Sequence, residues 1–184
     1  MTNTALLVID VQMAFVHRDA AGAVRSCPEA SQNIGMLLSA ARANGLPVIH
    51  VHHHSLEENS AFRAELSGSD VQPFAAPQND EAVYVKHVNS SFIGTSLETD
   101  LRDAGIERLI LCGGTANHCV ETTTRMAGNL GFDAVYVSDA VWAYNADGID
   151  GSVIPADTVH AVSMANLHGE FATVMNTETV LEQL

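Results

Sequence analysis

The sequence predicts an α/β fold with three α/β/α layers, in which helices cover both faces of a six-stranded, mostly parallel sheet. Short apolar runs of strand length alternate with segments of helical periodicity along the chain. Some runs, such as residues 5–9, are apolar at every position, which is typical of parallel strands covered on both faces. Neither a linker nor an internal repeat divides the sequence, so we expect one domain over residues 1–184.

The elements follow in a regular order. The predicted strands are residues 5–9, 48–52, 82–85, 109–112, 134–137 and 171–175. The predicted helices are residues 31–44, 95–104, 119–130 and 157–167, with a last helical turn or two in 177–184. Glycine follows three of these helices, where a helix C-cap places it. Residues 13–28 and 56–80 show no firm period, so we expect loops there.

Composition limits the class of protein. The chain is 47% hydrophobic and 16% charged, which indicates a globular protein. Its formal charge of −14 argues against nucleic acid and membrane surfaces as partners. No apolar run reaches membrane-spanning length and the N-terminus lacks the basic region of a signal peptide. We therefore expect a cytoplasmic protein, and the charge itself names no partner.

The segment 107–132 places a cysteine at a chemically favourable point. An apolar strand ends in Gly113-Gly114, and a helix then begins near Cys119. The first N–H groups of a helix are unpaired and its dipole favours negative charge, so we expect a lowered pKa for this thiol. The same N–H groups can hold an oxyanion. The alternative is that Cys119 is a small buried residue. We interpret Cys27 and Cys112 as structural, since the three cysteines have no zinc-type spacing and indicate no disulfide framework.

Three chemically distinct groups follow predicted strands. Asp10, Lys86 and Cys119 each come just after an apolar run. The carboxyl ends of parallel strands share one edge of a sheet, where ligands bind. Taken alone, Asp10 could be a helix N-cap and Lys86 a solvated lysine. Together the three predict a catalytic site at this edge.

Three motifs, in order, resemble one known family. They are VIDVQ at 8–12, KHVNSSFIGTSL at 86–97 and GGTANHCVETTTRMAGNLGF at 113–132. The chain resembles the isochorismatase-like cysteine hydrolases, which include nicotinamidases and related amidases, over nearly its full length. The resemblance implies the isochorismatase-like hydrolase fold described above.

The resemblance also implies a mechanism. Asp10, Lys86 and Cys119 would form a triad, the N–H groups of Thr115 and Cys119 would form the oxyanion hole, and the bond between Gly114 and Thr115 would be cis. The expected reaction is hydrolysis of a C–N bond in a small amide, ureide or lactam through a Cys119 thioester. No cofactor is implied. Relatives form oligomers, so we expect a homo-oligomer, a dimer or a tetramer.

Two other functions stay open. One is vinyl-ether hydrolysis as in isochorismatase, a branch that does not use a nucleophilic cysteine. The other is a binding protein of the family whose triad is idle. The sequence also departs from the family pattern twice. Ala116 stands where many members have threonine, and the stretch 50–54 lacks the aspartate of the nicotinamidase Asp-x-His metal motif.

Further side chains are candidates for contact with substrate. They are Gln12, Phe15, His52, His54, Phe92, Asn117, His118 and Trp142. Phe92 is either a pocket wall or a core residue, and Trp142 either covers substrate or lies in a subunit contact. Alternate histidines of a strand share one face, so His50, His52 and His54 either bind a metal or serve as sheet and wall residues. We assign no metal ligands.

Overall fold

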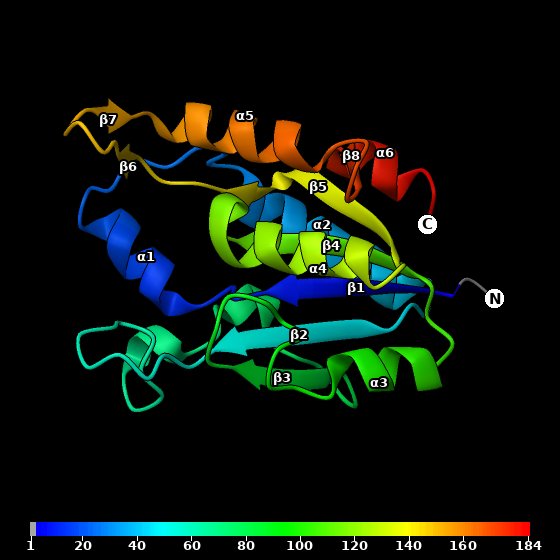
Figure 1. Cartoon of the computed structure of the whole chain (residues 1–184). Helices are drawn as coiled ribbons and strands as arrows, with labels where there is room; N and C mark the ends of the chain where they lie inside the picture. The colour runs from blue at the N-terminus through cyan, green and yellow to red at the C-terminus, as the bar shows by residue number, and fades with distance from the viewer. Residues whose placement is uncertain (1–2) are drawn as a thin grey trace.

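The computed structural model describes residues 3–184 and contains one six-stranded sheet (Figure 1). Its strand order is β3-β2-β1-β4-β5-β8, and every neighbouring pair is parallel. The strands are β1 (Thr4–Ile9), β2 (Val48–His53), β3 (Ala82–Lys86), β4 (Arg108–Gly114), β5 (Asp133–Trp142) and β8 (Thr173–Met175). The predicted fold class is therefore confirmed, with β3 and β8 at the edges of the sheet.

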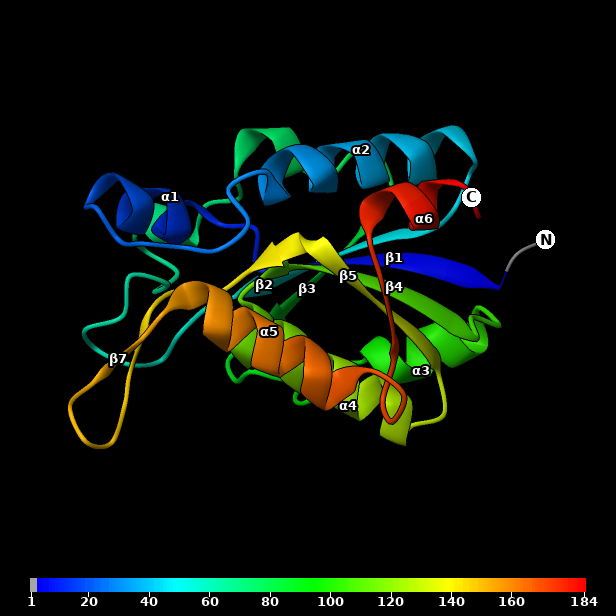
Figure 2. The ribbon, with the colours of Figure 1, turned by 90° about the horizontal axis from the view of Figure 1, so that it is seen from above.

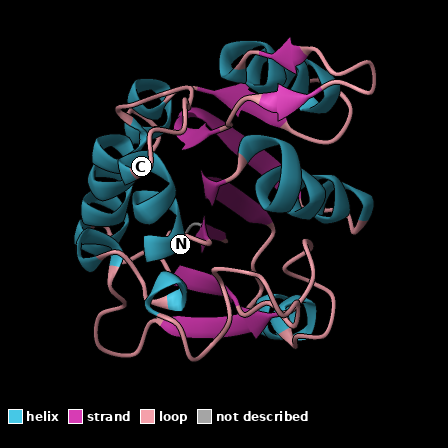
Figure 3. Cartoon of the chain, turned by 90° about the vertical axis from the view of Figure 1, so that its left-hand side faces the viewer, coloured by secondary structure: helices cyan, strands magenta, loops and turns pink. Residues whose placement is uncertain are grey.

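Helices cover both faces of this sheet. The helices α1 (Met13–Ala20), α2 (Ala30–Ala43) and α6 (Thr177–Leu181) lie on one side. The helices α3 (Leu97–Asp103), α4 (Glu121–Asn129) and α5 (Ala156–Leu167) lie on the other (Figure 2). Figure 3 shows the two helical layers with the strands between them. Within residues 3–184, no helix is both long enough and apolar enough to cross a membrane.

Two apolar cores result from the alternation of side chains along the strands. In β1, Leu7 and Ile9 are buried with residues of α3 and α4, whereas Leu6 and Val8 are buried against α2. Because both faces are buried, the strand is apolar throughout. Each fully buried aliphatic side chain contributes roughly 1.5–3 kcal/mol.

Several boundaries differ from the prediction. Residues 13–20 form the helix α1, where the sequence predicted a loop. Only Ala14 and Phe15 of this helix are buried, so its sequence shows no clear helical period of apolar residues. The segment that begins near Cys119 starts as a π-helical turn, Ala116–Val120, before α4. Strand β5 runs on to Trp142 with a shift in its register against β4. The end of β5 lies where a loop was expected. The same expected loop contains a short hairpin, formed by β6 (Ala146–Asp147) and β7 (Val153–Ile154).

The carboxyl ends of the strands point toward one end of the molecule (Figure 1). The same end holds α1, the β6–β7 hairpin and the long excursion between β2 and β3. That excursion contains two short 3₁₀ turns, Ser67–Ser69 and Pro73–Ala75. These irregular segments surround the point where β1, β3 and β4 end.

The two glycines that end β4 allow very close packing. Gly113 has a φ of +121°, and a Cβ there would lie 1.9 Å from the carbonyl oxygen of Ile9. At Gly114 a Cβ would lie 2.5 Å from the ring of Trp142 and 2.9 Å from that of Phe15. The chain can therefore turn between β1 and β5 only because both residues lack a side chain.

We predict that Gly113→Ala destabilises the protein by about 3 kcal/mol or more, because it combines backbone strain with a clash against β1. The matched control is Gly35→Ala in α2, where the new Cβ meets only a side-chain atom of Phe74 at 4.0 Å. The control should be neutral or stabilising by up to about 1 kcal/mol, since alanine favours a helix interior. Urea unfolding midpoints measure both changes. Equal midpoints for the two variants would show that the close approach at Gly113 is unimportant.

Candidate active site

The ends of three strands of the sheet, β1, β3 and β4, position the candidate triad. Asp10 directly follows β1, in a left-handed conformation with φ +51°. Lys86 is the last residue of β3, and Cys119 lies in the π-helical turn after β4. Asp10 and Lys86 are almost completely buried, and Cys119 is partly exposed. All three thus lie at the carboxyl edge of the sheet.

The ammonium of Lys86 lies between the other two groups. Its Nζ donates to Oδ2 of Asp10 at 2.7 Å and to Sγ of Cys119 at 3.3 Å. The structure therefore brings together the three side chains that the sequence singled out. Because the pair of Lys86 and Asp10 is excluded from water, the charges act on each other and on the thiol more strongly than at a surface.

A fourth side chain, His53, also contacts the ammonium. Its Nδ1 lies 3.2 Å from Nζ of Lys86. Burial, and then the charge of Lys86, lower the pKa of this histidine, so it is neutral and accepts the hydrogen bond. The sequence analysis missed His53 and chose His52 and His54. The signal was available in the alternation of the strand, because residue 53 points to the opposite face of β2 from residue 52. It also pairs with Lys86 across the ladder.

Gln12 holds His53 in place. Its Nε2 donates to the carbonyl oxygens of His53 (3.0 Å) and Ser69 (2.8 Å), and its Oε1 accepts from the N–H of His53 (2.8 Å). Both amide hydrogens are thus engaged, and the side chain has no exposed surface. Gln12, suggested as a substrate contact, instead joins the ends of β1 and β2 to the 3₁₀ turn at 67–69.

The pKa of the Cys119 thiol is raised, whereas its position near the start of a helix had predicted a lowered pKa. Burial raises the pKa of this thiol to about 12, the Asp10 carboxylate adds to the rise, and the Lys86 ammonium opposes it. Desolvation of the anion therefore outweighs the lysine, and the resting group is a thiol. The other carboxylate oxygen, Oδ1 of Asp10, is buried and has no hydrogen-bond partner among residues 3–184. It is an unused acceptor beside a protonated sulfur.

The turn before Cys119 is tightly organised. The peptide bond between Gly114 and Thr115 is cis. The N–H groups of His118 and Val120 both donate to the carbonyl of Thr115 at 3.2 Å. Ala116, where many family members have threonine, is fully buried, and its carbonyl accepts a hydrogen bond from Oγ of Ser163 at 2.8 Å. A small apolar residue thus fits this position in the core.

The aromatic candidates lie mostly in the cores. Phe92 is buried and stacks on Phe132 with centroids 6.0 Å apart. Trp142 has no exposed surface and meets Phe15 edge to face at 5.2 Å. Trp142 therefore supports the Gly114 turn from behind, and its ring has no exposed surface with which to cover substrate or contact another subunit.

The polar candidates have separate places. Asn117 is half-buried and His118 exposed, and both line a cavity of about 200 Å³. His54 is half-buried and lines a different surface pocket with Arg63. His52 is half-buried, and its Nε2 is enclosed without a hydrogen-bond partner within residues 3–184.

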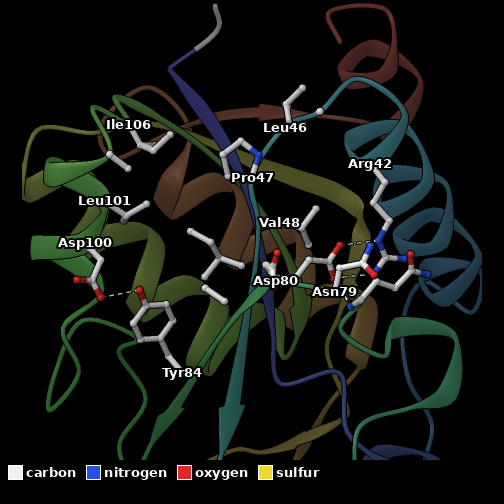
Figure 4. Close-up of a pocket in the computed structure, with 16 residues that line it drawn as sticks. Arg42, Leu46, Pro47, Val48, Asn79, Asp80, Tyr84, Asp100, Leu101 and Ile106 are labelled. Carbon is white, nitrogen blue, oxygen red and sulfur yellow. Dashed lines mark hydrogen bonds and ion pairs between the residues drawn. The ribbon is translucent and has the colours of Figure 1, made fainter.

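His50 belongs to an ionic cluster rather than to the triad. Its Nε2 lies 2.9 Å from Oε2 of Glu81, which also pairs with Arg42 at 2.7 and 2.9 Å. The pKa of Glu81 is lowered to about 2, and the hydrogen bond from Arg42 is the largest cause of this shift. This cluster borders a groove of about 590 Å³ near the start of β2 and β3, away from Cys119 (Figure 4). In the described part of the chain, no three His, Cys, Asp or Glu side chains are grouped so that they could hold a metal ion.

Comparison with known proteins gives consistent matches. A family model described as "Isochorismatase domain" matches residues 4–179. The uncharacterised isochorismatase family protein YrdC of Bacillus subtilis is 39% identical over 177 residues, which are 96% of this chain and 94% of that protein. The ureidoacrylate amidohydrolase RutB of Pseudomonas syringae is 31% identical over 171 residues, covering 75% of this chain and 70% of that protein.

Solved structures agree with these matches. A hydrolase of the isochorismatase family from Chromobacterium violaceum has a TM-score of 0.92 and 40% identity, covering 97% of this chain and 92% of that chain. A structure from Pseudomonas syringae, described as a cysteine hydrolase, has a TM-score of 0.89 and 28% identity, covering 98% and 92%.

We predict that alkylation of Cys119 by iodoacetamide is slow at pH 7 and accelerates steadily to pH 9, because a raised pKa leaves few thiolates over this range. Asp10→Asn removes a group that raises the pKa, so alkylation should be faster at every pH, by on the order of tenfold for each unit by which the pKa falls. Lys86→Met removes the group that lowers it and should slow the reaction. Mass spectrometry of the peptide that contains residue 119 measures the rate.

The matched control is Cys27, whose pKa is also raised to about 12, first by burial. It lies outside the triad, so its labelling rate should be equal in all three proteins. Slower labelling of Cys119 in Asp10→Asn would contradict the electrostatic account of the thiol.

Proposed function

The chain belongs to the isochorismatase family of hydrolases, and from this premise we propose that it hydrolyses a C–N bond of a small amide, ureide or lactam through a Cys119 thioester. The observation that carries the proposal is the buried Lys86 ammonium in contact with both the Asp10 carboxylate and the Cys119 sulfur. The similarity to an amidohydrolase and to a cysteine hydrolase supports it.

The first step is proton transfer from sulfur to carboxylate. Because the resting sulfur is a thiol, its proton must leave as the sulfur attacks the carbonyl carbon. Asp10 accepts this proton at its unused oxygen. Lys86 stays charged throughout and stabilises the negative charge that develops at sulfur and then at oxygen.

The remaining steps return the enzyme to its starting state. The N–H groups of Thr115 and Cys119 hold the oxyanion of the tetrahedral intermediate. Asp10 then gives its proton to the leaving nitrogen, the C–N bond breaks, and an acyl thioester remains. Water attacks the thioester and gives a proton to Asp10. The C–S bond breaks, the acid product leaves, and the thiol regains its proton from Asp10.

His53 and Gln12 are positioning residues in this mechanism. A Lys86 ammonium has three hydrogens, and Asp10, Cys119 and His53 accept one each. The neutral imidazole thus fixes the rotation of the ammonium without competing for its charge. Gln12 fixes the imidazole in turn by holding the His53 backbone from both sides.

Two alternatives make different predictions. Vinyl-ether hydrolysis needs no nucleophilic cysteine, so loss of the Cys119 sulfur would leave it largely intact. A binding protein with an idle triad would release no amine from any amide. Amine released in a screen of small amides, ureides and lactams therefore separates the proposed function from both alternatives. Assay of a vinyl ether with the unchanged protein and with Cys119→Ala separates the two alternatives from each other.

We predict that Cys119→Ala folds normally and lowers turnover of any amide found in the screen by at least about 10³-fold, since the nucleophile is removed. Stopped reactions of the unchanged protein should show a mass increase equal to the acyl group on the peptide containing Cys119. Cys27→Ala is the matched control, because Cys27 is half-buried and contacts no triad residue, and it should keep full turnover. Full amidase activity in Cys119→Ala would exclude the thioester route.

A further inference from the structure

A small cavity adjoins the proposed oxyanion site. Its volume is about 200 Å³, and the turn that precedes the nucleophile lines it with Thr115, Asn117 and His118. The opposite side comes from α1, through Arg18, and from the chain after β5, through Tyr144 and Asp147. A group bound here would lie next to the residues that flank Cys119 in the chain.

Arg18 differs from every other lysine and arginine. The chain has eight such residues against 22 acidic ones. Seven have a carboxylate oxygen within 4.0 Å; these are Arg25, Arg42, Arg63, Lys86, Arg102, Arg108 and Arg125. Among residues 3–184, Arg18 alone makes no such pair. In so acidic a protein, the one lysine or arginine of residues 3–184 without a carboxylate partner lines the cavity beside the nucleophile turn.

The exposed Arg18 side chain rests its guanidinium on an aromatic ring, a contact that does not use its hydrogen-bond donors. Its Cζ lies 4.0 Å from the centroid of the Tyr144 ring, a cation–π contact. That ring is fixed, because it stacks on Phe15 at 6.1 Å and its hydroxyl donates to Asp19 at 2.7 Å. Stacking holds the face of a guanidinium and leaves its N–H edge free to bind a planar anion with two hydrogen bonds.

The rest of the lining is compatible with an anion at Arg18. His118 adds a ring whose Nδ1 is engaged with Oγ1 of Thr115 at 3.1 Å, so its Nε2 remains for a ligand. Among the described residues, Asp147 is the only carboxylate that lines this cavity. A carboxylate bound by Arg18 would thus meet one competing negative charge.

We propose that Arg18 binds a carboxylate of the substrate, so that the chain acts on small amides or ureides carrying a carboxylate a few bonds from the scissile C–N bond. This inference rests on the proposed function and assigns the substrate class. Arg18 is then a specificity-determining residue, whose bidentate contact orients the carbonyl toward Cys119.

The test compares succinamate with succinamide, which differ mainly in that a charged carboxylate replaces a neutral amide. We expect the unchanged protein to prefer succinamate by at least about tenfold in kcat/KM, chiefly through KM. Arg18→Gln should lower the ratio of kcat/KM for succinamate to kcat/KM for succinamide to about one. Arg102→Gln is the matched control, because it removes the same charge from an exposed ion pair on α3. This variant should keep the preference for succinamate. Asp147→Asn should strengthen it.

A second arm does not need turnover. Butyrate should protect Cys119 from alkylation and 1-butanol should not, and Arg18→Gln should need at least about tenfold more butyrate for equal protection. Equal protection of the unchanged protein and Arg18→Gln, or none by butyrate, overturns the inference. If butyrate protects through Arg18 but no amide in the screen is hydrolysed, the proposed function fails and the carboxylate site stands. If amides are hydrolysed without preference for succinamate, the function stands and the substrate class is wrong.

Discussion

The buried pair of Lys86 and Asp10 is the interaction on which the rest of the site depends. Removing two ions from water costs several kcal/mol for each, and this cost is offset only when the two charges meet each other. Here they meet at 2.7 Å with almost no exposed surface. Such a pair resists substitution of either partner alone, because the remaining ion would be buried without compensation. It also sets the electrostatic state of the sulfur beside it.

The structure shows how a lysine and a carboxylate act together on the protonation of a buried thiol. Burial, and then the carboxylate, keep the sulfur protonated at rest, and the ammonium favours the anion when a carbonyl carbon approaches. A permanently ionised thiolate would need no general base but would be oxidised more readily. In the proposed mechanism, the proton that leaves the sulfur stays within the site, on the group that then protonates the leaving nitrogen.

The sequence predicted the sheet and the triad for the same reason. Uninterrupted apolar runs mark buried parallel strands, and polar residues directly after them, such as Asp10 and Lys86, gather at one edge. It did not predict α1, because that helix buries few residues, nor the task of Gln12, which depends on backbone atoms distant in the chain. The pKa of Cys119 was expected in the wrong direction, since local helix geometry is visible in a sequence and desolvation by the whole fold is not.

The position of Lys86 on β3 has a further consequence. This strand lies at the margin of the sheet, has a single neighbour, and exposes Val83 and Val85 to solvent. Margins are where native proteins open most readily, often without global unfolding. Detachment of this one strand would withdraw the ammonium and leave the cysteine and the carboxylate in place. The charge pair therefore also anchors an edge strand to the centre of the molecule, so that loss of local order at this edge would remove the ammonium from the proposed site.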